Sequence, residues 1–169
     1  DHYRIVIEND TGPDWDSLIL RIKEAFVKAT GKQPKEAKSP GAPNVVLEKH
    51  EGEPVRLNEY RSITGKLLYY ATKVGPDLSN AVRELASHLS SPGEAHWRAL
   101  ERCVGYLTSQ KPEEQGMIYR RPRELRVICY ADSDYAKCPS TRRSISGGLC
   151  TIGGTITAWY SRKQPTVTL

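Results

Sequence analysis

Hydrophobic positions recur along the chain at two spacings, and the first of them is helical. Between residues 14 and 31 apolar side chains return every three to four positions, as on one face of an amphipathic helix. Asp14 or Asp16 can cap its start, and Gly31 can end it. The same spacing continues in three further segments: residues 58–74, residues 76–89 and a stretch after Ser91. Ser91 and Glu94 have capping-box spacing, with Pro at the first helical position.

Residues 32–56 interrupt the helical pattern. They are rich in Lys, Glu, Pro and Gly, with one short strand expected at residues 44–47. Such a segment is either an exposed linker or a strap across a neighbouring surface, and its composition favours the linker.

From residue 116 the spacing changes to two, which is typical of strands. Strands are expected at residues 117–119, 125–131, 146–152 and 155–161, with a short one near residues 3–7. Gly153 and Gly154 supply a two-residue hairpin turn. The pattern predicts an α+β fold: a helical bundle followed by an antiparallel β-meander. Because no helix follows to cover this small sheet, the C-terminal unit is expected to be incomplete.

Composition limits the class of protein. The 169 residues suit one domain or a domain with part of another, and the missing initiator Met suggests a piece of a longer chain. No apolar run is long enough to cross a membrane. The formal net charge is +5, and residues 119–163 hold nine Lys and Arg against three acidic residues. Such a balance permits a nucleic-acid partner without demanding one.

The four cysteines follow no common disulfide or metal-binding pattern. We therefore expect reduced, partly buried thiols. A zinc site built from His88, His96 and Cys103 is conceivable, but its spacing fits no common template.

The sharpest candidate for chemistry is Tyr130–Asp134, where an apolar strand meets a polar turn. The carboxylates of Asp132 and Asp134 can hold Mg²⁺, which prefers oxygen ligands. Four basic residues suit a phosphate backbone: Arg142, Arg143, Arg162 and Lys163. The alternative is that the two aspartates only cap the turn, and spacing alone favours it.

Aromatic and histidine residues in the helical part have simpler interpretations. One of Tyr69 and Tyr70 should face the core and the other the surface, although an exposed Tyr can also stack on bases. Trp97 is expected in the core. His88 and His96 are expected to be surface or capping residues.

Several blocks together resemble the C-terminal part of copia-type retrotransposon polyproteins, in that family's order and spacing. They are Tyr60–Tyr70, Pro76-Asp77 with Ala81–Leu85, Pro92–Leu100, Tyr130–Ala136, Arg142–Gly148, and Ile152–Gly154 with Trp159–Gln164. The resemblance implies the end of a reverse transcriptase in residues 1–56, a thumb and connection region in residues 57–115, and the truncated start of an RNase H domain in residues 116–169.

That resemblance also implies a function. The thumb-like helices would grip a template–primer duplex, and the strands would begin a fold that cleaves RNA–DNA hybrids with two Mg²⁺ ions. Asp132 matches the first RNase H carboxylate, and Asp134 matches a recurrent Asp. The Tyr-x-Asp-Asp polymerase motif and the other RNase H carboxylates are missing from this sequence. We therefore expect a fragment that binds no Mg²⁺ tightly and is not catalytic alone.

The same resemblance implies partners and a location for the chain, and it leaves two alternative functions open. The expected partners are an RNA–DNA hybrid or template–primer duplex and the rest of the polyprotein, with no membrane. The expected location is cytoplasmic, within a virus-like particle, or nuclear. A non-catalytic nucleic-acid-binding remnant and a decayed reading frame without activity are the alternatives.

Overall fold

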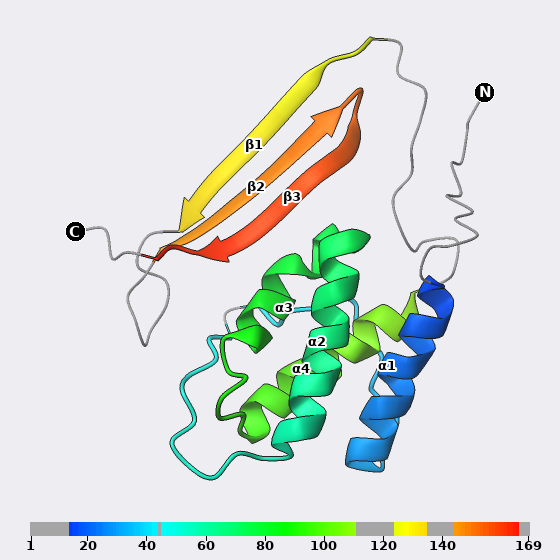
Figure 1. Ribbon diagram of the computed structural model, residues 1–169, viewed down its shortest axis with the longest axis vertical. Coiled ribbons are helices and arrows are strands. Elements are labelled where there is room, and N and C mark those ends of the chain that lie inside the picture. Colours follow the sequence, from blue (N-terminus) through cyan, green and yellow to red (C-terminus); the bar gives the residue numbers. More distant parts are fainter. Residues whose placement is uncertain (1–13, 44, 111–123, 135–143, 166–169) are drawn as a thin grey trace. The chain divides into compact units, whose positions relative to one another are not determined.

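The computed structural model describes residues 14–43, 45–110, 124–134 and 144–165 (Figure 1). The chain divides into two compact units, residues 13–115 and residues 116–169 together with 1–12. The described elements are α1 (Trp15–Thr30), α2 (Leu57–Lys73), a 3₁₀ turn η1 (Pro76–Leu78), α3 (Ser79–Ala86), α4 (Glu94–Ser109), β1 (Val127–Asp134), β2 (Ile145–Ile152) and β3 (Thr155–Lys163). The α+β class is therefore confirmed. The strands expected near residues 3–7 and at 117–119 lie outside the described residues.

Helix α1 begins and ends at the residues that its sequence indicates. The Asp14 carboxylate accepts a hydrogen bond from the backbone N–H of Ser17 at 3.1 Å, which satisfies one free donor of the first turn. Gly31 ends the helix at a φ of +70°, a conformation that glycine adopts without a steric cost. Ile22 and Phe26 are buried on the expected face.

The helical unit encloses one hydrophobic core, to which all four helices contribute. Its buried members are Ile22, Phe26, Leu47, Tyr60, Ile63, Leu67, Tyr70, Ala71, Leu78, Val82, Leu85, Trp97, Leu100, Cys103, Val104 and Leu107. The Tyr60 hydroxyl is buried with them and donates to the backbone oxygen of Leu85 at 3.0 Å, so α2 and the end of α3 are tied together. This bond satisfies a polar group that burial alone would destabilise.

Helix α4 begins later than the sequence predicts, because a different residue caps it. Gly93 is the N-cap, and its backbone N–H donates to Nδ1 of His96 at 2.8 Å. The Ser91 hydroxyl instead donates to the carbonyl of Gly52 at 3.4 Å. The expected capping box of Ser91 and Glu94 is thus wrong, and His96 plays the role that Glu or Gln usually plays at the third helical position.

Residues 32–56 cross the surface of α4, and we call this segment the strap. Arg102 donates to the carbonyl and hydroxyl oxygens of Ser39 at 3.1 and 2.9 Å. Ser109 donates to the carbonyl of Ala37 at 3.3 Å. A Cβ added to Gly105 would collide with the Lys35 carbonyl, so the strap backbone rests where α4 has no side chain. The prediction of an exposed linker was wrong for this part of the segment.

The second half of the strap is held by the core. Leu47 is buried, and residues 45–47 do not form the expected strand. The Val55 carbonyl accepts a bond from the Trp97 indole at 2.7 Å, while the Val55 N–H donates to Pro92 at 2.8 Å. These contacts satisfy both backbone groups of Val55 and hold the end of the strap beside the start of α4.

The second unit contains a three-stranded antiparallel sheet in the order β1-β2-β3 (Figure 1). Gly153 and Gly154 connect β2 to β3 at φ values of 57° and 82°, as the two-residue turn requires. The register shifts between Cys150 and Thr151 where β2 meets β3. Among the described residues of this unit only Ser144 and Thr155 are buried, and both are polar, so the described part of the sheet encloses no hydrophobic core of its own.

Candidate functional site

Asp132 lies near the end of β1, and its side chain is exposed. Its backbone is paired with Gly147 of β2, and Gly147 is in turn paired with Ser161 of β3. Directly paired residues share a face of the sheet, and alternate residues along a strand do so as well. Asp132, Gly147 and Ser161 therefore form one row across one face.

The middle of this row is open. A Cβ added to Gly147 would meet nothing closer than the backbone oxygen of Tyr160 at 3.9 Å. With two strand spacings between them, Asp132 and Ser161 stand roughly 10 Å apart. We call this row the glycine strip, because it offers a carboxylate at one end, a hydroxyl at the other and no side chain between them.

Lys163 lies on the same face as Asp132, but Arg162 does not. Lys163 is paired with Ile145, which is two residues from Gly147 on β2 and therefore on its face. Arg162 is paired with Ser146, on the opposite face. Arg162 and Lys163, which are adjacent in sequence, thus place their side chains on opposite faces of the sheet.

The other candidate residues are only partly described. Asp134 ends β1, with its backbone paired to Ile145. Arg142 and Arg143 lie outside the described residues. The described structure therefore brings together Asp132, Ser161 and Lys163 on one face. The sequence prediction missed Gly147 and Ser161, because only the register of the three strands places them in one row with Asp132.

The metal-binding side chains near Asp132 do not make up a complete two-metal centre. Within the described ranges, no group of three or more His, Cys, Asp or Glu side chains is placed to hold a metal ion. Two divalent ions need several carboxylates that converge, because each ion takes six or more oxygen ligands shared with water and substrate. Asp132 alone does not supply this set of ligands.

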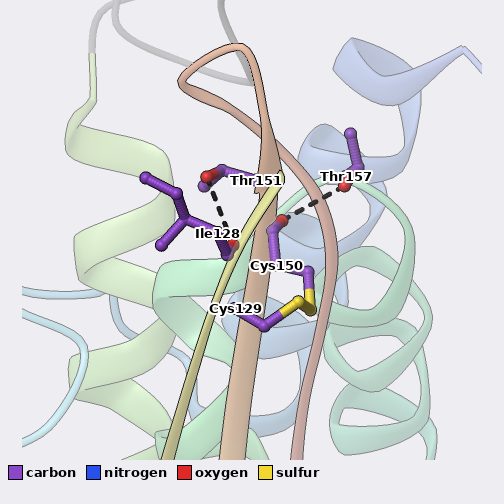
Figure 2. The surroundings of a disulfide bond; sticks show 5 residues. All are labelled: Ile128, Cys129, Cys150, Thr151 and Thr157. Atoms are coloured by element: carbon purple, nitrogen blue, oxygen red, sulfur yellow. Dashed lines mark hydrogen bonds between the residues drawn. A yellow bond between two sulfur atoms is a disulfide. The ribbon is translucent and has the colours of Figure 1, made fainter. Parts of the chain in front are cut away.

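The cysteines differ from expectation. Cys129 of β1 and Cys150 of β2 are directly paired in the sheet and form a disulfide, with their Cα atoms 4.1 Å apart (Figure 2). The expectation that all four thiols are reduced was wrong, because the strand register brings these two together. Cys103 is free and buried, and burial raises the pKa of its thiol to about 12.

Aromatic side chains of the helical unit lie as expected. Tyr70 is buried and Tyr69 is 43% exposed. The Trp15 ring lies 5.9 Å from each of these tyrosine rings, centroid to centroid. Trp97 is buried in the core. Burial, followed by the negative charge of Asp77, raises the pKa of Tyr70 to about 12.

The histidines near α4 serve the fold. His96 is 1% exposed and stacks on His88, with ring centroids 4.1 Å apart. Burial, opposed by the backbone of Glu48, lowers the pKa of His96. His88, His96 and Cys103 do not form a metal site among the described residues. The expectation that His96 is a capping residue is confirmed, although it is buried rather than on the surface.

Comparison with known proteins identifies the family. The chain is 36% identical to the secreted RxLR effector protein 161 of Plasmopara viticola over 65% of this chain and 76% of that protein. It is 30% identical to the retrovirus-related Pol polyprotein from transposon RE1 of Arabidopsis thaliana, over 96% of this chain and 11% of the polyprotein. It is 26% identical to that from transposon TNT 1-94 of Nicotiana tabacum, over 98% of this chain and 13% of the polyprotein.

The chain belongs to the family of retrovirus-related Pol polyproteins of copia-type transposons. It spans about a tenth of the length of these polyproteins and about three-quarters of the RxLR effector protein. No protein-family model matches the chain, and no solved structure matches it. None of the described helices is long and apolar enough to cross a membrane.

Proposed function

We propose that the chain is the junction between the reverse transcriptase and the RNase H domain of a copia-type polyprotein, where it binds an RNA–DNA hybrid without cleaving it alone. The observation that carries this proposal is the alignment of 96% of the chain with a Pol polyprotein. In this interpretation α2, α3 and α4 are thumb and connection helices, and β1 to β3 open an RNase H-like fold.

The face of the sheet that carries Asp132 is the proposed site of contact with the hybrid. It combines an exposed carboxylate, the glycine strip and the charge of Lys163. The ammonium group of Lys163 attracts a backbone phosphate, while the strip leaves room for the sugar-phosphate chain to approach the sheet. In the parent polyprotein, Asp132 would be one ligand of the Mg²⁺ ions, and the further carboxylates would come from outside this sequence.

Hybrid binding across a salt series tests this proposal, and the two faces of β3 supply a matched pair of variants. Lys163→Gln is expected to weaken binding of a fluorescent RNA–DNA hybrid and to lower the slope of log K against log salt by about one. Arg162→Gln removes the same charge from the neighbouring position on the other face, and should leave the slope within error.

Three outcomes separate the proposal from its alternatives. Equal effects of both variants would mean that only net charge matters and that the Asp132 face is not the site. Absence of binding at low salt would favour a decayed sequence without activity. A third result would favour the non-catalytic remnant. In that case this face binds the hybrid, but the chain fused to the following segments of a related polyprotein still does not cleave it in Mg²⁺.

A further inference from the structure

The disulfide between Cys129 and Cys150 lies at a place in the sheet where the pairing of two strands is otherwise weakly specified. β2 contains consecutive glycines, Gly147 and Gly148, within its eight residues. Glycine has no side chain to pack against the opposite strand, so a strand rich in glycine fixes its register poorly. Tyr160 covers Gly148 from β3, but the space over Gly147 is open.

The two cysteines occupy a non-hydrogen-bonded pair of the β1–β2 ladder. The N–H of Gly153 donates to the carbonyl of Arg126 at 2.9 Å, which makes that pair a hydrogen-bonded one. Because the two kinds of pair alternate, the pair three residues further along each strand is non-hydrogen-bonded. At such pairs the Cα atoms approach most closely, in agreement with the 4.1 Å between Cys129 and Cys150.

Bonds around the disulfide hold β2 on both sides (Figure 2). The Thr151 hydroxyl donates to the carbonyl of Ile128 at 3.4 Å, and the Thr157 hydroxyl donates to the carbonyl of Cys150 at 3.2 Å. Cys129 itself is an exposed residue, which favours the approach of a thiol in solution to the disulfide. Cys103 does not compete for pairing, because its thiol is buried and contacts the carbonyl of Pro40 at 3.2 Å.

We propose that Cys129 and Cys150 form a reversible redox site that clamps β1 to β2 and thereby fixes the face of the sheet on which Asp132 lies. The co-reactant is a dithiol reductant. One of its thiolates attacks the disulfide and forms a mixed disulfide, and its second thiolate then displaces the remaining sulfur. Two electrons pass from the dithiol to the cystine, the reductant leaves as a disulfide, and two protons end on Cys129 and Cys150.

Asp132 is three residues from Cys129 on the same strand, so the clamp acts directly on its position. A slip of one residue between β1 and β2 would move the Asp132 side chain to the other face of the sheet. The oxidised form holds Asp132 in the row of Gly147 and Ser161, whereas the reduced form relies on backbone pairing across the two glycines.

Peptide mapping and hydrogen exchange on the full chain test the redox site without any nucleic acid, so the result is independent of the proposed function. Digestion of the unreduced protein should release one cross-linked pair of peptides that contain Cys129 and Cys150. Cys138→Ser, the control, should leave this cross-link in place. A different pair, or none, under oxidising conditions would overturn the proposal.

Reduction should then loosen only the sheet. For a cross-link that spans 21 residues, the population of opened β1–β2 pairing is expected to rise roughly a hundredfold, with faster amide exchange in residues 127–134 and 145–152. Exchange in α2 and α4 should not change. The variant Cys129→Ser/Cys150→Ser should exchange like the reduced protein and ignore the reductant. Unchanged exchange of the sheet on reduction of the native protein would refute the proposal, whether or not the variant folds.

Discussion

The side chain of His96 joins two functions that usually fall to different residues. It accepts the N–H of Gly93 at the start of α4, and its ring fills a buried position against His88. A protonated ring donates from both nitrogens, so it can no longer accept this bond. The neutral form is therefore the one that the fold requires.

This requirement predicts a loss of stability in mild acid. The pKa of His96 lies below its ordinary value of 6.5, chiefly because of burial, and the charges of His50 and Glu84 also bear on it. Since the unfolded chain then binds the proton more readily, His96 stabilises the fold fully above pH 6.5. The contribution is lost as the pH falls through the folded pKa, with a slope of at most about 1.4 kcal/mol per pH unit.

Urea unfolding between pH 5 and 8 measures this slope. His96→Gln can still accept the Gly93 N–H as a capping residue, but it does not titrate. The difference between the two curves isolates His96 from His50 and His88, which remain in both proteins. If the variant kept the full pH dependence of the native chain, the other histidines would be responsible.

At the scale of elements, the strap and α4 depend on a close approach of backbones at Gly105. Gly105→Ala places a methyl group against the Lys35 carbonyl, so the strap must move or α4 must bend. We expect the free energy of unfolding to fall by about 1–3 kcal/mol, as for other overpacked sites.

A second glycine provides the control for this prediction. Gly65 lies on the exposed side of α2, with nothing within 4 Å of an added Cβ. Gly65→Ala should stabilise the protein by about 0.5–1 kcal/mol through helix propensity alone. Chemical unfolding followed by circular dichroism compares the two variants. Changes of the same sign would show that no close contact exists at Gly105.

The elements also show which features of the fold can be predicted from sequence. Asp14, Gly31 and the pair Gly153-Gly154 act within a few residues, so local rules find the ends of α1 and the β2–β3 turn. The path of the strap was missed because its bonds to α4 join residues 63 and 72 positions apart and use backbone carbonyls. Composition carries no trace of such contacts.

The candidate site was predictable to a similar degree. The exposed position of Asp132 on a strand follows from a short apolar run that ends in a polar turn. The pairing of Cys129 with Cys150 depends on strand register. The separation of Arg162 from Lys163 depends on β3 continuing to Lys163, beyond the strand predicted at residues 155–161, since adjacent residues of a strand face opposite sides. Register is set jointly by turn, bulge and packing, so residue spacing alone does not give it.

At the scale of the whole molecule, the two units differ in how they are stabilised. Every buried apolar residue in the described structure belongs to the helical unit. The sheet relies on its ladder, its turn and one disulfide. Because each helix buries its apolar face against the others, the helical unit needs no contact with the sheet to exclude water from its core.

We therefore expect residues 13–115 to fold without the rest of the chain. The isolated segment should unfold in one cooperative transition, with a helical circular dichroism spectrum and the dispersed indole resonance of a buried Trp97. A broad, non-cooperative transition would mean that the sheet completes the helical core. Residues 116–169 alone are expected to show no cooperative transition of comparable size, since a small sheet without a core is marginal.

The strap has a further consequence for the order in which the chain is made. Synthesis runs from the N-terminus, so residues 32–56 leave the ribosome before α4, to which they bind. Closing such a long loop costs entropy before any contact repays it. Until α4 emerges, the strap has no helix to bind, and the apolar faces of α1 and α2 lack the side chains of α4 that cover them in the finished unit. The emergence of this one helix therefore completes both the core and the binding of the strap.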